Sequence, residues 1–252
     1  MKLTQRNYFS RKANKEFMSV SQFKSFERCQ NAALAEINGR YEQEKTTALL
    51  VGSYVDSYFE GTLENFKKKN PEIFKRDGSL KAEYIQAEAI IERIKKDKLF
   101  MKYISGQKQV IMSGTISGVP VKIKIDSLLP DKVVDLKIMK DFEAGNGGLP
   151  WFEAWGYDLQ GAVYQEIVRQ NTGLKLPFYL AAATKEKTTA IDIVHIGQQH
   201  LDMALQHFTA HVELFDAIKK KIIAPERCER CDYCKNTKVL KEPTESDEFY
   251  LM

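Results

Sequence analysis

The sequence predicts an α/β protein in which a central mixed sheet of about five strands is flanked by helices and follows a mainly helical N-terminal part. Residues 107–138 alternate apolar and polar side chains, with turn signals at 118–120 and 130–131, which indicates three antiparallel strands. Two further apolar runs, 177–185 and 189–196, have strand character and are short. The other long segments space their apolar residues as helices do.

Helices are expected over about 18–37, 48–69, 81–97, 151–170 and 198–221. The residues before about Phe17 are polar and basic and are expected to be irregular. We interpret the chain as one domain with four parts: a helical part (1–106), an α/β core (107–221), a cysteine-containing segment (222–240) and a mobile acidic tail (241–252).

Charge and hydropathy restrict the class of protein. The formal net charge is +4 and the pI is near 8.7, which permits a polyanionic partner without requiring one. No apolar run approaches the ~20 residues that a membrane helix needs, and the N-terminus has no signal-peptide pattern. We therefore expect a cytoplasmic protein with no membrane partner.

The strand at 132–138 carries an acid and a base on its polar face. Val134, Leu136 and Ile138 alternate onto one face, which leaves Asp135 and Lys137 side by side on the other. Asp126 ends the preceding strand, so the two aspartates are expected to meet across the ladder. Like charges repel unless a cation lies between them.

Mg²⁺ or Mn²⁺ could be that cation, held by Asp126, Asp135 and the backbone carbonyl of Leu136. Lys137 could then position or deprotonate a water, or stabilise charge on a phosphate. The alternative is a solvated ion pair on an exposed strand.

These residues resemble the motif of the PD-(D/E)xK nuclease superfamily, whose core is restriction-endonuclease-like. Gln160 and Tyr164, four apart on the following helix, are similar to the Q-x-x-x-Y signature of its RecB-like branch. The resemblance implies that they contact DNA phosphate or hold the catalytic lysine. The branch also carries G-x-x-x-H on an upstream helix. Here Gly52 is followed by Asp56, and Asp56 or Glu60 could still bind metal; both could equally be surface acids.

The four cysteines indicate a metal centre. Cys228, Cys231 and Cys234 form a C-x2-C-x2-C run, and Cys29 lies about two hundred residues earlier. Four thiolates can hold Zn²⁺ or a 4Fe–4S cluster. The stretch 19–29 resembles the opening of iron–sulfur RecB-like nucleases such as the AddB nuclease domain and phage-type exonucleases. That resemblance implies a structural 4Fe–4S cluster; the short spacing between Cys231 and Cys234 leaves zinc as the alternative.

Taken together, the resemblance implies a metal-dependent DNA exonuclease that hydrolyses phosphodiester bonds at linear double-stranded ends for recombination or repair, with a single-strand annealing protein as a candidate partner. Two alternatives stay open. One is a non-catalytic DNA- or partner-binding module on the same fold, and the other is a zinc protein whose cysteines are the recognition element.

Several side chains could contact DNA. We expect core packing for Trp151 and Trp155, with base stacking as the alternative. Lysines near the sheet could follow a phosphate backbone or simply face solvent: Lys122, Lys124, Lys132, Lys137 and Lys140.

Overall fold

The computed structural model describes residues 1–143, 145, 148–240 and 243. Its centre is a five-stranded sheet in the order β1-β2-β3-β4-β5, with β3 and β4 parallel and the other neighbours antiparallel. The predicted α/β fold with a mixed five-stranded sheet is therefore confirmed. The strands are β1 (Gln107–Ile116), β2 (Val119–Leu129), β3 (Lys132–Met139), β4 (Phe178–Thr184) and β5 (Ile191–His195).

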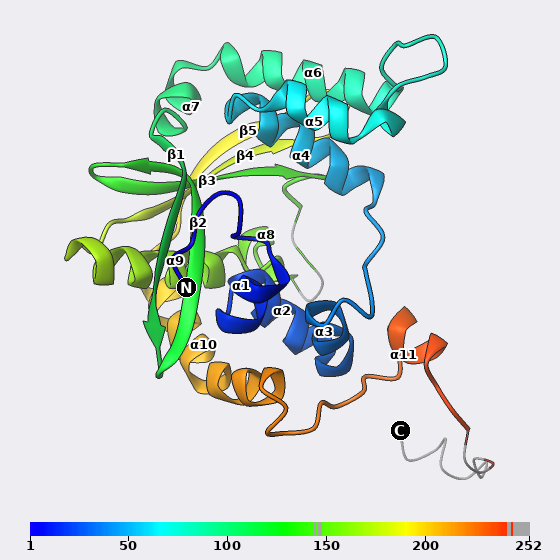
Figure 1. Ribbon diagram of the computed structural model, residues 1–252. Helices are drawn as coiled ribbons and strands as arrows, with labels where there is room; N and C mark the ends of the chain where they lie inside the picture. The colour runs from blue at the N-terminus through cyan, green and yellow to red at the C-terminus, as the bar shows by residue number, and fades with distance from the viewer. Residues whose placement is uncertain (144, 146–147, 241–242, 244–252) are drawn as a thin grey trace.

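Helices cover both faces of the sheet (Figure 1). On one face lie α4 (Thr47–Phe59), α6 (Ala82–Lys95) and α7 (Lys98–Tyr103), packed over β3 and β4. On the other lie α2 (Val20–Arg28), α3 (Gln30–Ile37), α9 (Tyr157–Thr172) and α10 (Gln198–Lys219). The shorter helical elements are α1 (Arg11–Glu16), α5 (Leu63–Lys69), η1 (Pro71–Ile73), α8 (Trp151–Ala154) and α11 (Asp232–Asn236).

The faces of β3 follow the predicted alternation. Val134 and Leu136 belong to the core under α4 and α6, whereas Val133 belongs to the core under α9 and α10. Each face of a strand collects every second residue, so Asp135 and Lys137 are directed away from the α4 side. The polar pair thus lies within the molecule rather than on an outer surface.

Several predicted helices are shorter than expected. Residues 18–37 form two helices because Cys29 is extended (φ −167°, ψ 109°), and it caps both α2 and α3. The helix expected over 48–69 ends at Phe59, and Gly61 follows with φ 74°. Gly156, with φ 61°, separates α8 from α9.

The N-terminal residues were wrongly expected to be irregular throughout. Helix α1 begins after Ser10, whose side chain accepts a hydrogen bond from the Ala13 amide. The helix has six residues and buries only Ala13, so it shows no apolar periodicity that could have predicted it. The acidic tail predicted over 241–252 lies outside the described residues except for Pro243, as does part of the Gly-rich connector after Glu143.

Two predictions about single side chains were also wrong. Lys122, expected in a basic track or at the surface, is 1% exposed because the N-terminal segment covers it. Trp151 packs against the core as expected, but Trp155 is 61% exposed. None of the described helices combines the length and the apolar character needed to cross a membrane.

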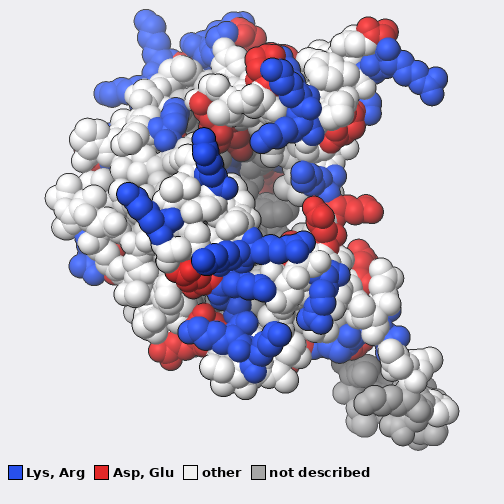
Figure 2. Space-filling model, in the orientation of Figure 1, with Lys and Arg blue, Asp and Glu red and all other residues white. Residues whose placement is uncertain are grey.

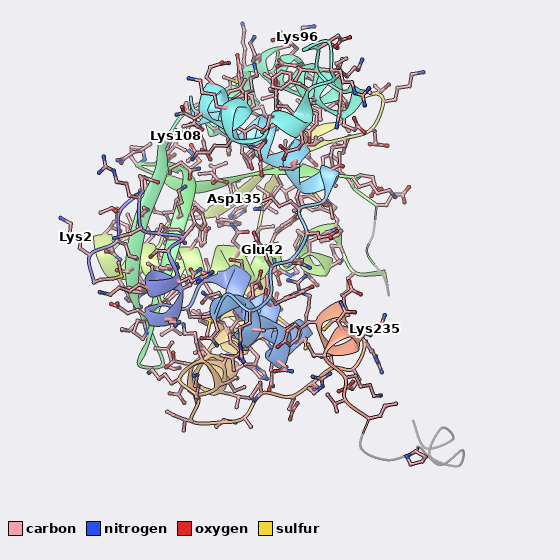
Figure 3. All side chains as sticks on the ribbon, turned by 45° about the vertical axis from the view of Figure 1, so that its right-hand side comes forward. Lys2, Glu42, Lys96, Lys108, Asp135 and Lys235 are labelled. Atoms are coloured by element: carbon pink, nitrogen blue, oxygen red, sulfur yellow. The ribbon has the colours of Figure 1, made fainter. Side chains whose placement is uncertain are left out.

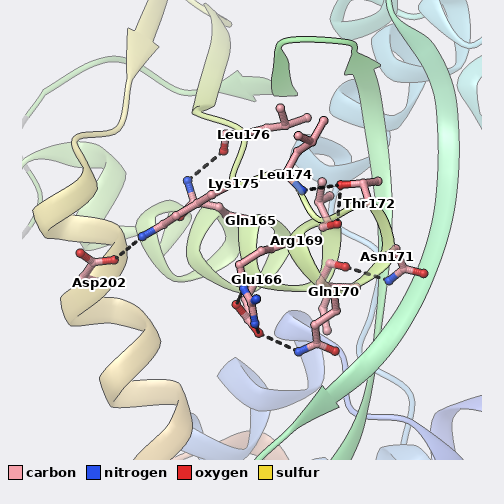
Figure 4. Close-up of polar contacts among 12 residues, drawn as sticks. Gln165, Glu166, Arg169, Gln170, Asn171, Thr172, Leu174, Lys175, Leu176 and Asp202 are labelled. Carbon is pink, nitrogen blue, oxygen red and sulfur yellow. Dashed lines mark hydrogen bonds and ion pairs between the residues drawn. The ribbon is translucent and has the colours of Figure 1, made fainter.

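Helix α9 is fixed at its C-terminal half by polar contacts (Figure 4). Gln165 donates to the Leu176 carbonyl at 2.8 Å, and Gln170 both donates to the Thr115 carbonyl and accepts from its amide. Lys175, just beyond the helix, pairs with Asp202 of α10 at 3.3 Å. These contacts hold the C-terminal half of the helix against β1, the segment before β4 and α10.

Gly161 allows α9 to lie close to β4. A Cβ atom at this position would overlap the ring of Phe178. We expect Gly161→Ala to lower the free energy of unfolding by about 1–3 kcal/mol, the usual cost of overpacking a core. Gly52→Ala is the matched control, because a Cβ there meets nothing within 4 Å; it should stabilise helix α4 by about 0.5–1 kcal/mol. Urea unfolding of both variants measures the difference, and equal changes would contradict this account.

Candidate active site

Asp126 and Asp135 meet where β2 and β3 separate. The ladder between these strands runs from Leu129↔Lys132 to Ser127↔Val134, and the next opposed pair would be Asp126 and Asp135. There the Leu136 amide donates to Asp126 Oδ2 at 3.1 Å, so a carboxylate takes the place of a backbone partner. Figure 3 shows that Asp135 lies deep in the molecule, between the layer of α4–α6 and the N-terminal helices.

The Asp135 carboxylate is bound from two sides. Lys137 Nζ lies 2.5 Å from Oδ2, and Gln160 of α9 donates to Oδ1 at 2.7 Å. Lys137 also lies over the ring of Tyr157, 4.9 Å from its centroid. Burial by itself would lower the pKa of Lys137, but the carboxylates of Asp135 and Asp126 outweigh it and hold the pKa above its ordinary value. The contact with the Asp135 carboxylate therefore favours the ammonium form of Lys137.

Tyr164 supports the strand rather than the lysine. Its hydroxyl donates to the backbone carbonyl of Lys124, two residues before Asp126. Gln160 and Tyr164 do lie on one face of α9, but in this structure they hold Asp135 and β2 respectively.

Asp56 and Glu60 approach the same place from α4. Together with Asp126 and Leu136 they line one small cavity. Burial raises the pKa of Asp56 to about 7; the positive charge of Lys137 opposes this shift, and the Glu60 and Asp135 carboxylates add to it. The Oδ1 atom of Asp56 is buried and accepts no hydrogen bond from any described residue. Asp56 therefore faces the cavity. It occupies the position at which the RecB-like branch has a histidine.

Two residues of β1, Lys108 and Gln109, complete the cavity, and no sequence motif pointed to them. Gln109 donates to Asp126 Oδ1 at 3.2 Å, and Lys108 lines the cavity beside it. Gln109 has φ 54°, the left-handed region that non-glycine residues rarely adopt, which marks a local break in the strand. This break can be located only once β1 and β2 are aligned.

The oxygen atoms at this site suit a hard divalent cation. Burial, with the nearby Asp135 and Asp56 carboxylates, raises the pKa of Asp126 well above its ordinary value. A bound Mg²⁺ or Mn²⁺ would lower the repulsion among these carboxylates and would give the buried Asp56 Oδ1 atom a partner. The ligand atoms of these acids are more widely spaced than those of the cysteines. Among the described residues, only the four cysteines bring three or more His, Cys, Asp or Glu ligand atoms within 4.8 Å of one another.

The four cysteines come together although Cys29 is 205 residues from Cys234. Cys29 Sγ lies 3.5 Å from Cys234 Sγ, and all four sulfurs lie within 4.8 Å of one another. The Cys231 and Cys234 amides donate to Cys228 Sγ and Cys231 Sγ. Backbone amides lower the pKa of Cys228 to about 6, whereas burial raises the pKa of Cys231 to about 12. Four convergent sulfurs fit a thiolate metal centre.

The fold and this site define a protein of the PD-(D/E)xK superfamily. Residues 19–237 match the family described as a PDDEXK-like domain of unknown function (DUF3799), and the chain belongs to that family. It is also similar to a solved structure, a "Putative exonuclease" from Eubacterium rectale, at 50% sequence identity over 99% of this chain and 98% of that one, with a TM-score of 0.95. No curated protein matches the sequence. Family and neighbour together support a nuclease.

Proposed function

We propose that this protein is a metal-dependent DNA nuclease that removes nucleotides from linear ends. The observation that carries the proposal is the convergence of Asp126 and Asp135 where β2 and β3 separate, with Lys137 and Gln160 on the same carboxylate. The family and the exonuclease name of the Eubacterium rectale protein support it. DNA is then the substrate, and a single-strand annealing protein would be a partner that receives the product.

Each residue has a separate part in this proposal. Asp126, Asp135 and Asp56 would hold Mg²⁺ or Mn²⁺, with Glu60 and the Leu136 carbonyl as further oxygen ligands. When bound, the ion supplies Lewis-acid stabilisation of a phosphoryl oxygen and acidifies water. Lys137 provides a fixed positive charge where negative charge develops on the phosphate. Gln160 orients Asp135, and Tyr164 holds β2 so that Asp126 keeps its place.

The decisive test is a cleavage assay on anaerobically purified protein with Mg²⁺ or Mn²⁺. We expect loss of a linear duplex with defined ends, survival of covalently closed circular DNA, and no cleavage by Asp135→Asn. Cleavage of the circle would contradict the exonuclease assignment. DNA that is bound but intact in the presence of either metal would favour the alternative, a binding module.

The role of Gln160 leads to a second test. Gln160→Met removes the hydrogen bond that the Gln160 amide donates to the Asp135 carboxylate. Loss of a hydrogen bond to a metal-binding side chain lowers metal affinity or activity by about 10–100-fold. Gln170→Met is the control on the same helix, because Gln170 lies ten residues, almost three helical turns, after Gln160 and contacts Glu166 and Thr115 (Figure 4). Metal titrations of the cleavage rate compare the two variants. Equal rates would remove Gln160 from the site.

The cysteines are proposed to form a structural metal centre. A tetrahedral ion with Zn–S bonds near 2.3 Å spaces its sulfurs by about 3.8 Å, in the range observed, whereas a 4Fe–4S cluster binds each thiolate to a different iron and spaces them more widely. The spacing favours Zn²⁺, and the resemblance favours the cluster. Iron, zinc and sulfide analysis with a visible absorption spectrum decides between them.

A further inference from the structure

Two hollows meet at the candidate active site. One, of about 900 Å³, contains Asp56, Glu60 and Asp126, and the other, of about 780 Å³, contains Lys24, Tyr157 and Gln160. Tyr8, Ser21 and Tyr164 line both. Figure 2 shows the surface hollowed between the two halves of the molecule, with Lys and Arg side chains around the opening. A chain-like ligand could therefore pass from one hollow to the other across the acids.

Each hollow has an exposed aromatic ring on its wall. Trp155, 61% exposed, lines the second hollow, and Phe9, 71% exposed, lines the first. Solitary exposed apolar side chains are common and need no explanation by themselves. These two differ because the backbone under each ring is held by a lysine from another element.

Lys24 of α2 holds the backbone of Trp155. Its ammonium group donates to the Trp155 carbonyl at 2.6 Å and to the Gly156 carbonyl at 3.2 Å. Gly156 is left-handed, and a Cβ there would lie 3.2 Å from Lys24 Cε, so the turn is fitted closely to the lysine. The backbone of Trp155 is therefore held in place while its ring faces solvent.

Lys122 of β2 does the same beside Phe9. Its buried ammonium group donates to the Tyr8 carbonyl at 2.5 Å and to Asn14 Oδ1 at 2.7 Å. The Phe9 ring packs edge-on against Tyr8, with centroids 4.9 Å apart, and Lys124 Nζ lies 5.2 Å from its centroid. Burial lowers the pKa of both Lys24 and Lys122 to about 8. The hydrogen bonds to the Trp155 and Tyr8 carbonyls offset part of the cost of desolvating each ammonium group, and they tie the backbone beside each exposed ring to another element.

We propose that Phe9 and Trp155 are base-stacking residues that position a single unpaired DNA strand on either side of the candidate active site. Aromatic rings stack on unpaired bases of any sequence, whereas bases inside a duplex are already stacked on each other. Lys69, Lys108 and Lys124 in the first hollow and Arg28 in the second provide positive charge for the strand's phosphates. This inference rests on the proposed function. It implies that the DNA bound beside Asp126 and Asp135 is a single strand separated from its complement.

The chain offers a direct reporter, because it has two tryptophans. Trp151→Phe keeps an aromatic ring against Phe142 and Tyr157 and leaves Trp155 as the only source of tryptophan fluorescence. This variant is titrated with a cleavage-resistant phosphorothioate single strand and with a duplex of the same composition closed by hairpins at both ends. We expect the single strand to quench Trp155 and the closed duplex to leave it nearly unchanged.

Binding of the single strand is then compared among variants. Phe9→Ala and Trp155→Ala should each weaken it by about 5- to 150-fold, whereas Phe9→Tyr and Trp155→Tyr should restore most of it. Leu99→Ala, at a 57% exposed residue outside both hollows, should bind as the parent does. Equal quenching by both DNAs, or unchanged binding by the alanine variants, overturns the inference. Because no cleavage is needed, quenching without nuclease activity would reject the proposed enzyme and leave the binding surface in place.

Discussion

Lys137→Met is expected to lower the rate of DNA cleavage by about 10²–10⁴-fold while DNA binding is largely kept. The reason is the position of the ammonium group, which lies 2.5 Å from Asp135 and is held over Tyr157, next to the place where the acids would bind metal. A cation fixed there stabilises the negative charge that develops during phosphodiester hydrolysis. Single-turnover cleavage with saturating protein measures the loss without interference from binding.

Two further variants show what the lysine contributes. Lys140→Met is the control: Lys140 lies just after the same strand, and its side chain is 88% exposed. This variant should cleave DNA at the normal rate. Lys137→Arg keeps the charge on a side chain that cannot lose its proton. If the role is electrostatic, the arginine variant should retain clearly more activity than the methionine variant. Equal loss in both would instead indicate that the neutral amine is needed to accept a proton.

The polar face of β3 could be predicted because it depends only on alternation. A strand that places Val134 and Leu136 in one core must direct Asp135 and Lys137 to the other face, whatever the rest of the fold does. The closeness of Asp126 needed only a short turn between two strands. The four-residue spacing of Gln160 and Tyr164 predicted a common helix face, but not that one side chain would reach a carboxylate and the other a backbone carbonyl.

The residues that were missed depend on contacts between distant segments. Gln109 reaches Asp126 because β1 leaves its regular conformation at Gln109, and Lys24 reaches the Trp155 carbonyl from a helix 131 residues earlier. Lys122 occupies an alternating strand position that is typical of a solvent-facing lysine, yet the segment with Tyr8 and Asn14 covers it. Local patterns describe one element at a time, so they cannot predict such coverage.

Cys29→Ser is expected to lower the melting temperature by roughly 5–15 °C and to abolish binding of the metal at the cysteines. The proposed thiolate centre would join the N-terminal helices to the C-terminal segment, because Cys29 and Cys234 lie side by side although they are 205 residues apart. A metal that binds the folded site and not the unfolded chain stabilises the fold by about 3–4 kcal/mol at 100 to 1,000 times its Kd. Each kcal/mol shifts the melting temperature by about 2–4 °C for a chain of this length. Calorimetry and metal analysis on the same sample measure both effects.

Serine at position 29 isolates metal binding from local structure. The Cys29 sulfur also accepts a hydrogen bond from the Ala32 amide at the start of α3, and a serine hydroxyl can replace it there. Gln30→Ala is the matched control, because Gln30 accepts from the Glu226 amide and links the same two segments without binding metal. Its loss should cost only about 1 kcal/mol and leave the metal in place. If Cys29→Ser kept its metal and had the melting temperature of the parent protein, Cys29 would not be a metal ligand. The ends of the domain would then be held together by packing alone.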